Sequence, residues 1–169
     1  INRVGGAWRF PVKQGVATYL SNVSNKDFAL SMLKDGERDF LIGKKLIEEN
    51  FYDKSVYHFQ QSVEKCIKAV LISIGIFQKT HFVGQVLKKS LSERDIPEPW
   101  TEKLLKIASI SDGIEPEVSL SRYPGIIDDN LWLPYEEYQK IDAENAGEKA
   151  EETMLVTKDF LQYWFSDSQ

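Results

Sequence analysis

Residues 58–70 read HFQQSVEKCIKAV, and this stretch decides the fold of the chain. Its apolar residues recur every three or four positions, which places them on one face of an α-helix. The same pattern continues in both directions and predicts a helix over about residues 53–76, with Gly75 as its stop signal. Two glutamines, a glutamate and two lysines lie between the apolar residues. Such side chains either connect neighbouring helices or bind a ligand.

The segment before this helix predicts a second long helix. Ser24 is followed three residues later by Asp27, which resembles a capping box with Asp in place of the usual Glu or Gln. From there the apolar periodicity runs to about Glu49. Gly36 and Gly43 share one face of this helix, so we expect a neighbouring helix to approach closely there.

Three further helices are expected after residue 76. Thr80 is predicted to cap a short helix over residues 81–90. The prolines within residues 96–99 break the chain, and a helix beginning at Trp100 is expected after them. Asp142 is predicted to cap the last and longest helix, whose apolar residues lie at successive turns.

The remaining segments set the domain boundaries. Residues 112–134 contain glycines and prolines and are predicted to form a long loop, since no alternating run indicates a strand. The fold class is therefore all-α, an antiparallel helical bundle of four to five main helices. Residues 25–165 are predicted to form the bundle, residues 1–24 an extension with a short amphipathic helix, and residues 166–169 a tail.

Composition narrows the class of protein. The 169 residues, 42% hydrophobic and 28% charged, are typical of one soluble globular domain. A net charge of -5 excludes a global positive field that would attract nucleic acid. The single cysteine, Cys66, allows no internal disulfide and fits a reducing cytoplasm. The longest apolar run, residues 69–77, is far shorter than the ~20 residues of a membrane span. We expect a cytoplasmic protein without membrane partners.

Polar residues along the central helix are the first candidates for function. Gln60 and Gln61 lie at the edge of the apolar stripe, where a buried amide without partners costs about 1–3 kcal/mol. They could connect helices or offer donors to a ligand. Glu64 and Lys68 form a pair four residues apart, and a solvated surface pair is as good an explanation as a functional one. Lys65 lies in the next row outward.

Two other regions supply candidates. His81 lies at an expected helix start, where free N–H groups favour an anion such as phosphate, although a capped helix that happens to begin with histidine is commoner. His58 faces away from the apolar stripe and is expected to be exposed. In residues 121–125 (SRYPG), Arg122 offers a fixed fork for phosphate or carboxylate, and Tyr123 offers a stacking face. Alternatively, Arg122 anchors the loop.

Several classes of site are absent from the sequence. Neither glycine-rich phosphate-binding motif occurs, and neither does H-E-x-x-H or C-x-x-C. With two histidines and one cysteine we expect no metal site. The spacing of residues supports no Ser/His/Asp arrangement. No cofactor is expected.

Four segments together resemble the HEPN family, a name that abbreviates "higher eukaryotes and prokaryotes nucleotide-binding". They are YDKSVYHFQQSVEKCIKAVL (52–71), THFVGQVLKKS (80–90), SRYPG (121–125) and AENAGEKAEETMLVTKDF (143–160). The resemblance includes a QQ-x-x-E-K-x-x-K-A core, a following T-H, and an R-Y-P before the last long helix. It covers residues 27–164 and implies a small helical bundle.

The resemblance also implies partners and activity. HEPN proteins usually pair through their helices, which implies a homodimer. Many prokaryotic members accompany a minimal nucleotidyltransferase as its nucleotide- or substrate-binding half. Others are RNA-cutting toxins, marked by an Arg followed after four to six residues by His. No arginine stands at positions 51–53 or 74–76, and no histidine follows Arg122. A non-enzymatic protein is therefore expected.

We interpret the chain as a HEPN-type accessory protein that binds a nucleotide or phospholigand between residues 58–70 and the SRYPG turn, near a dimer interface. The lysines and the arginine would meet phosphate, Tyr123 would stack on a base, and a glutamine would bond its edge. The residues expected to bind ligand are Gln60, Gln61, Lys65, Lys68, His81, Arg122 and Tyr123. The alternatives are a toxin-like ribonuclease using His81 with Arg122, and a protein-interaction module.

Overall fold

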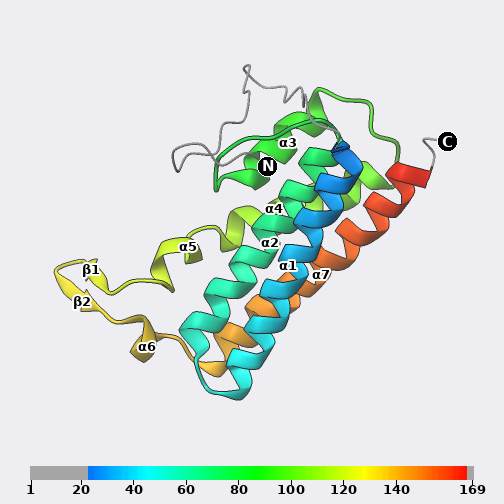
Figure 1. Cartoon of the computed structure of the whole chain (residues 1–169). Helices are drawn as coiled ribbons and strands as arrows, with labels where there is room; N and C mark the ends of the chain where they lie inside the picture. Colours follow the sequence, from blue (N-terminus) through cyan, green and yellow to red (C-terminus); the bar gives the residue numbers. More distant parts are fainter. Residues whose placement is uncertain (1–22, 167–169) are drawn as a thin grey trace, which may run out of the picture.

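The computed structural model describes residues 23–166 (Figure 1). The short helix expected within residues 1–24 and the end of the predicted tail therefore fall outside the described residues. Five main helices form the fold: α1 (Asn25–Glu48), α2 (Tyr52–Ser73), α3 (Val83–Ser92), α4 (Trp100–Ile114) and α7 (Lys140–Ser166). Four short elements lie between the last two: α5 (Glu117–Leu120), β1 (Gly125–Ile127), β2 (Asn130–Trp132) and α6 (Pro134–Glu137). The predicted all-α bundle is confirmed.

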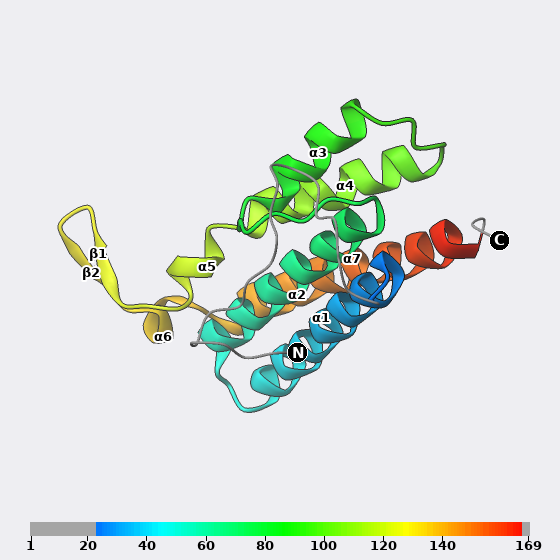
Figure 2. The ribbon, with the colours of Figure 1, turned by 45° about the horizontal axis from the view of Figure 1, so that its top comes forward.

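The long helices α1, α2 and α7 lie side by side, and α2 is packed against both of the others. The shorter α3 and α4 pack against each other and cover a further side of α2, as Figure 2 shows. The core lies between these elements. Its largest fully buried hydrophobic side chains include Phe59, Ile67, Leu87, Leu104, Ile107, Phe160 and Leu161. As the most enclosed helix, α2 carries both the core stripe and the polar residues singled out above.

The predicted start of α1 is confirmed. Ser24 is the N-cap, and its hydroxyl accepts a hydrogen bond of 3.0 Å from the N–H of Asp27. The Asp27 carboxylate reaches back to the N–H of Ser24 at 3.4 Å and to its hydroxyl at 2.6 Å. A capping box with Asp in the third position therefore satisfies the first turn of the helix.

One aromatic side chain fixes the spacing of the three long helices. Phe59 on α2 is 1% exposed, and it lies against Gly43 of α1 and Gly147 of α7. A Cβ atom placed on Gly43 would lie 2.7 Å from the Phe59 ring, and one placed on Gly147 would lie 3.1 Å away. At Gly36 the nearest atoms include the Ser62 carbonyl oxygen at 3.2 Å. The close approach expected at Gly36 and Gly43 is confirmed.

Two of the predicted helix starts are wrong. Thr80 does not cap α3: its hydroxyl accepts the N–H of Phe82 at 3.1 Å, two residues on, and the helix begins only at Val83. This local turn competes with capping and leaves His81 in the loop before the helix. Asp142 lies inside the first turn of α7, where its carboxylate accepts the N–H of Gln139 at 2.8 Å.

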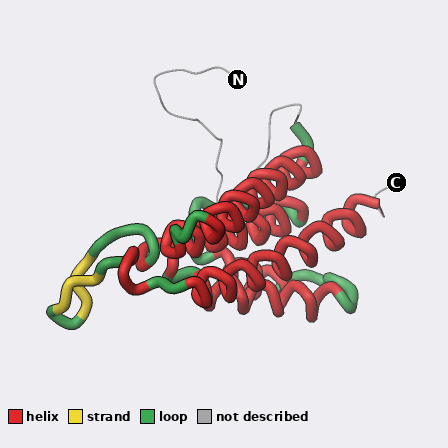
Figure 3. Tube along the Cα trace, turned by 90° about the horizontal axis from the view of Figure 1, so that it is seen from below, coloured by secondary structure: helices red, strands yellow, loops and turns green. Residues whose placement is uncertain are grey.

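Residues 115–138, called the arm from here on, project from the bundle at the end opposite the C-terminal end of α7 (Figure 3). The prediction that this region has no strand is wrong. The strands β1 and β2 form an antiparallel hairpin in which Ile126 is opposite Leu131. Asp128 and Asp129 connect them with positive φ angles of 47° and 61°, the backbone that suits a two-residue hairpin. Strands of three residues are too short to show alternation in a sequence.

Candidate functional site

Glu64 is the centre of a buried polar network on α2. The residue is 5% exposed, and its carboxylate accepts hydrogen bonds from Lys68 at 2.6 Å, His81 at 3.0 Å and Gln60 at 3.3 Å. Burial acts to raise the pKa of Glu64, but the bonds from Lys68 and His81 outweigh it and the pKa is lowered. The interpretation of Glu64 and Lys68 as a solvated surface pair is wrong, because Glu64 is an enclosed anion with three donors.

The two glutamines belong to the same network. The Gln61 amide donates to the Gln60 carbonyl oxygen at 2.7 Å, and the Gln60 amide in turn donates to Glu64. Gln60 is 2% exposed, so both ends of its amide are used inside the bundle. Gln61 is half-buried. Of the two roles left open for these residues, the contacts support connection within the bundle.

Asp39 on α1 is the centre of a second network. Its carboxylate accepts bonds from Lys65 at 2.5 Å and from His58 at 2.8 Å, and Lys65 also reaches Asp35 at 2.6 Å. Burial alone would raise the pKa of Asp39, but the two donors lower it. Burial would lower the pKa of Lys65, but its two carboxylate partners raise it. His58 is half-buried, so the expectation that it is exposed is wrong.

Arg122 stands at the start of the arm in a different environment. Its side chain is exposed, and its Cζ atom lies 5.2 Å from the ring centroid of Tyr57 on α2 and 4.9 Å from that of Tyr123. Lys54 donates to the Arg122 carbonyl oxygen at 3.4 Å. We call Tyr57, Arg122 and Tyr123 the Arg122 cluster. Within residues 23–166 no carboxylate forms an ion pair with Arg122, so its guanidinium can accept an external anion.

The sequence-predicted residues therefore divide into separate groups. Arg122 and Tyr123 meet α2 at Tyr57, whereas His81 meets α2 at Glu64. These two positions are seven residues apart, about 10 Å along a helix axis. Lys65 and Lys68 are bound to carboxylates. The turn contacts the central helix at Lys54 and Tyr57, just before the expected residues 58–70, and only Arg122 and Tyr123 of the seven candidates stand in the exposed cluster.

Sequence reasoning missed several residues of these sites. No role is predicted for Tyr57 from the sequence, yet it is the side chain that α2 contributes to the Arg122 cluster. Asp39 and Lys54 were not among the candidates. The sequence pattern that comes nearest to predicting a role for Tyr57 is its spacing from Gln61, which places both residues on one face of α2. Asp39 and Lys65 are 26 residues apart, and Lys54 and Arg122 are 68 residues apart, beyond the reach of periodicity.

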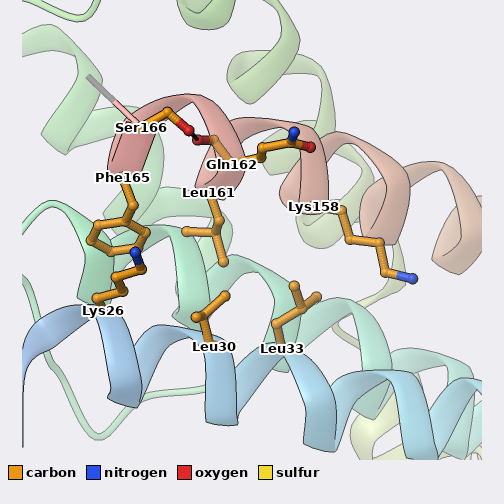
Figure 4. Close-up of a pocket in the computed structure, with 8 residues that line it drawn as sticks. All are labelled: Lys26, Leu30, Leu33, Lys158, Leu161, Gln162, Phe165 and Ser166. Atoms are coloured by element: carbon orange, nitrogen blue, oxygen red, sulfur yellow. Dashed lines mark hydrogen bonds between the residues drawn. The ribbon is translucent and has the colours of Figure 1, made fainter. Parts of the chain in front are cut away.

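Two cavities lie away from all seven candidates. One is a groove between α1 and α7, shown in Figure 4 and described further below. The other, at the base of the arm, lies beside Glu117 and Tyr138. The Tyr138 hydroxyl donates to the Glu117 carboxylate. Burial raises the pKa of Glu117, and the Tyr138 hydrogen bond only partly opposes this.

Residues 23–166 also bear on metal and membrane binding. In this part of the chain no three or more histidine, cysteine or carboxylate side chains gather where a metal ion could be held. None of the described helices combines the length and the apolar character needed to cross a bilayer. Cys66 is a free, fully buried thiol, and burial raises its pKa to about 12.

Comparison with known proteins decides the family. The family model of the HEPN domain matches residues 29–160. The chain belongs to the HEPN family. The archaeal protein named "Putative toxin MJ1304", from Methanocaldococcus jannaschii, is 41% identical over 138 residues, which are 82% of this chain and 91% of that protein. The HEPN assignment made from residue patterns is therefore confirmed.

Two crystal structures share the fold of this HEPN protein. TT1696 from Thermus thermophilus superposes with a TM-score of 0.60 at 19% identity, over 78% of this chain and 96% of that one. ST0689, described as an archaeal HEPN homologue, gives a TM-score of 0.59 at 22% identity, over 79% and 97% of the two chains. At these identities the likeness concerns the fold alone.

Proposed function

We propose that this HEPN protein is a non-enzymatic binding protein that takes a nucleotide or another phosphate-bearing ligand at the Arg122 cluster. One observation carries the proposal: the Arg122 guanidinium is exposed, lies over two tyrosine rings and has no carboxylate partner in residues 23–166. An arginine presents several N–H donors in a planar fork that matches phosphate oxygens. Tyr57 and Tyr123 add faces on which a base can stack.

In this proposal the other candidate residues contribute less to ligand binding than the sequence predicts. Lys65 and Lys68 each donate to a carboxylate of their own network, at 2.5 Å and 2.6 Å. A phosphate would have to separate these pairs, and the carboxylates left behind would repel it. The lysines and glutamines therefore stabilise the contacts of α2 within the bundle, and Arg122 supplies the principal positive charge for the ligand.

The proposal also includes a partner protein. A protein that binds a phosphate-bearing ligand without a catalytic motif suits an accessory role beside a minimal nucleotidyltransferase, which is the role the family resemblance implies. The absence of an Arg-x(4–6)-His motif supports a binding function over cleavage. So does the separation of His81 and Arg122, which contact α2 two turns apart.

Calorimetric titration tests the binding site. ATP, ADP, AMP and inorganic phosphate are titrated into the wild-type protein, and Arg122→Ala is expected to weaken binding of the preferred nucleotide at least about tenfold, or 1.4 kcal/mol. The melting temperature should change little, because the side chain is exposed. Arg94→Ala, an exposed arginine elsewhere, is the matched control. Binding that is absent at millimolar ligand, or equally weakened in both variants, contradicts the proposal.

A second candidate function is a toxin, which the name of the relative that is 41% identical favours, acting by RNA cleavage as the family resemblance implies. Incubation of the wild-type protein with single-stranded RNA tests this function on a gel. The ribonuclease candidate requires cleavage that is lost in His81→Ala and retained in Lys89→Ala, an exposed lysine on α3. Intact RNA with the wild-type protein removes this candidate and leaves the binding function.

A further inference from the structure

The groove between α1 and α7 leaves apolar side chains open to solvent. Its volume is about 340 Å³, and Figure 4 shows that its lining comes from the first turns of α1 and the last turns of α7. Leu30 is 43% exposed and Phe165 is half-buried, whereas Leu33 and Leu161 are buried. Lys26 lies 5.8 Å from the Phe165 ring centroid and pairs with no carboxylate of the described chain. An open apolar groove of this kind marks a contact with a further segment or molecule.

The chain enters α1 at the rim of this groove. Ser24, the N-cap of α1, has extended backbone angles of φ -77° and ψ 158°, so α1 does not continue upstream of it. The lining of the groove begins at Lys26, two residues further on. Val23, the first residue that the structure describes, is 51% exposed. Residues 1–22 are therefore tethered beside the groove, which gives them a high effective concentration for it.

The amino-acid sequence of the tethered segment suits an apolar groove. Val12, Val16, Tyr19 and Leu20 recur at helical spacing, and on an α-helix they fall within an arc of about 100°. Val23 continues the same stripe. Residues 1–22 contain no acidic residue that could pair with the free lysine, so apolar contact is the interaction that they offer. The match to the HEPN family model begins only at residue 29, so the family assigns this segment no role.

The lengths of the segment and of the groove also agree. Residues 12–20 as an α-helix would be about 14 Å long, and the side of the groove from Lys26 to Leu33 on α1 is about 10 Å long. Residues 21–23 in an extended conformation reach about 10 Å. This reach matches the distance of about 8–10 Å between the axes of packed helices. A helix of residues 12–20 can therefore lie along the groove, antiparallel to α1, without a longer connection.

We propose that residues 12–20 of this chain pack as an amphipathic helix in the groove between α1 and α7 of the same chain. The apolar stripe of this helix contacts Leu30 and Phe165, while Gln14 and Thr18, on its opposite side, face solvent. The exposed apolar surface at this end of the bundle is covered by the segment that precedes it in the sequence. The packing does not depend on ligand binding at the Arg122 cluster.

Hydrogen exchange of the full chain, followed by mass spectrometry, is the first test. So short a helix is not stable alone in water, so protection of its amides reports packing on the bundle. In the wild type the amides of residues 12–20 are expected to exchange at least about tenfold more slowly than in an unfolded peptide. Leu30→Asp should remove this protection, and Leu41→Asp, at a 64% exposed position on α1 outside the groove, should retain it.

Circular dichroism verifies that both variants are folded. Three results overturn the proposal: wild-type amides of residues 12–20 that exchange at the unfolded rate, protection that persists in Leu30→Asp, and protection that is lost equally in Leu30→Asp and Leu41→Asp.

Cysteine cross-linking locates the contact without relying on a destabilising charge. The double variant Val16→Cys with Leu30→Cys is expected to form a disulfide within one chain on mild oxidation, seen as a faster monomer band on a non-reducing gel. The native Cys66 is buried and does not interfere. Val16→Cys with Leu41→Cys is the control. A cross-linked dimer band, which would place a second copy in the groove, overturns the proposal, and so does equal cross-linking in both pairs or none in the first.

Discussion

The central helix α2 and the arm both carry many polar residues, but they differ in whether their charged side chains form ion pairs. Along α2, Glu64 and the lysines at positions 65 and 68 are each bound to groups of opposite charge at 2.5–2.6 Å. In the arm, Arg122 and the carboxylates of Asp128 and Asp129 form no ion pair with any residue in 23–166. Charged side chains therefore hold helices together in one region and are without ion-pair partners among the described residues in the other.

This difference changes where a ligand or a partner is sought. A buried charge that already has its donors would lose them on binding an outside group, which costs free energy. An exposed arginine over aromatic rings loses only water. The polar residues of α2 attract attention in the sequence because they interrupt an apolar stripe, yet the proposed recognition site belongs to the arm. Three pairs of variants, each matching a bundle residue with an arm residue, test this division.

The largest effect is expected from an aromatic residue in each region. Phe59→Ala removes a ring that three helices enclose, and it should lower the free energy of unfolding by about 3–5 kcal/mol. Tyr135→Ala, at a position 65% exposed in the arm, should change it by no more than about 0.5 kcal/mol. Urea denaturation measures both. A similar loss in the two variants would show that the arm is part of the cooperative core.

A smaller effect is expected from a glutamate in each region. Glu64→Ala leaves Gln60, Lys68 and His81 without their acceptor and should cost about 1–3 kcal/mol. Glu136→Ala removes an exposed arm carboxylate and should be close to neutral. The same denaturation series measures the pair. An unchanged midpoint in Glu64→Ala would mean that the network contributes no stability and would reopen α2 as a binding surface.

The smallest effect is expected in how the free energy of unfolding depends on pH. Folding lowers the pKa of the Asp39 carboxyl, so ionised Asp39 adds to the free energy of unfolding above the pKa that it has in the unfolded chain, about 4. This stabilisation is lost as the pH falls through the pKa of the folded state. Asp39→Asn should therefore be on the order of 1 kcal/mol less stable than the wild type at pH 7, with the difference shrinking below pH 4. Glu137→Gln in the arm is the control. A gap between Asp39→Asn and wild type that stays constant from pH 7 to pH 3 contradicts this assignment.

Local patterns predicted most of the architecture. The capping box at Ser24, the helical periodicity through α2 and the close approach at Gly43 each depend on neighbours in the sequence or on one helix face, and each is confirmed. The start of α3 was wrong, because Thr80 forms a turn in place of a cap. The hairpin was missed since its strands have three residues each.

The candidate site was less predictable, because burial of a polar side chain depends on distant segments. Glu64 and Lys68 look like a surface pair in the sequence, and His81 from the following loop completes the network. Asp39 gathers His58 and Lys65 from another helix. Only Arg122 and Tyr123, which follow each other in one short turn, were recognised together. Their third member, Tyr57, lies 65 residues before Arg122.

The position of Phe59 between two glycines also has a mechanical consequence. The ring fills the notch where Gly43 and Gly147 lack side chains, so axial sliding of either outer helix along α2 would drive backbone atoms into the ring. The three long helices must therefore translate and rotate as one rigid body. If a ligand binds at Arg122 as proposed, the displacement is expected where the arm joins α4 and α7 and not as sliding of the long helices.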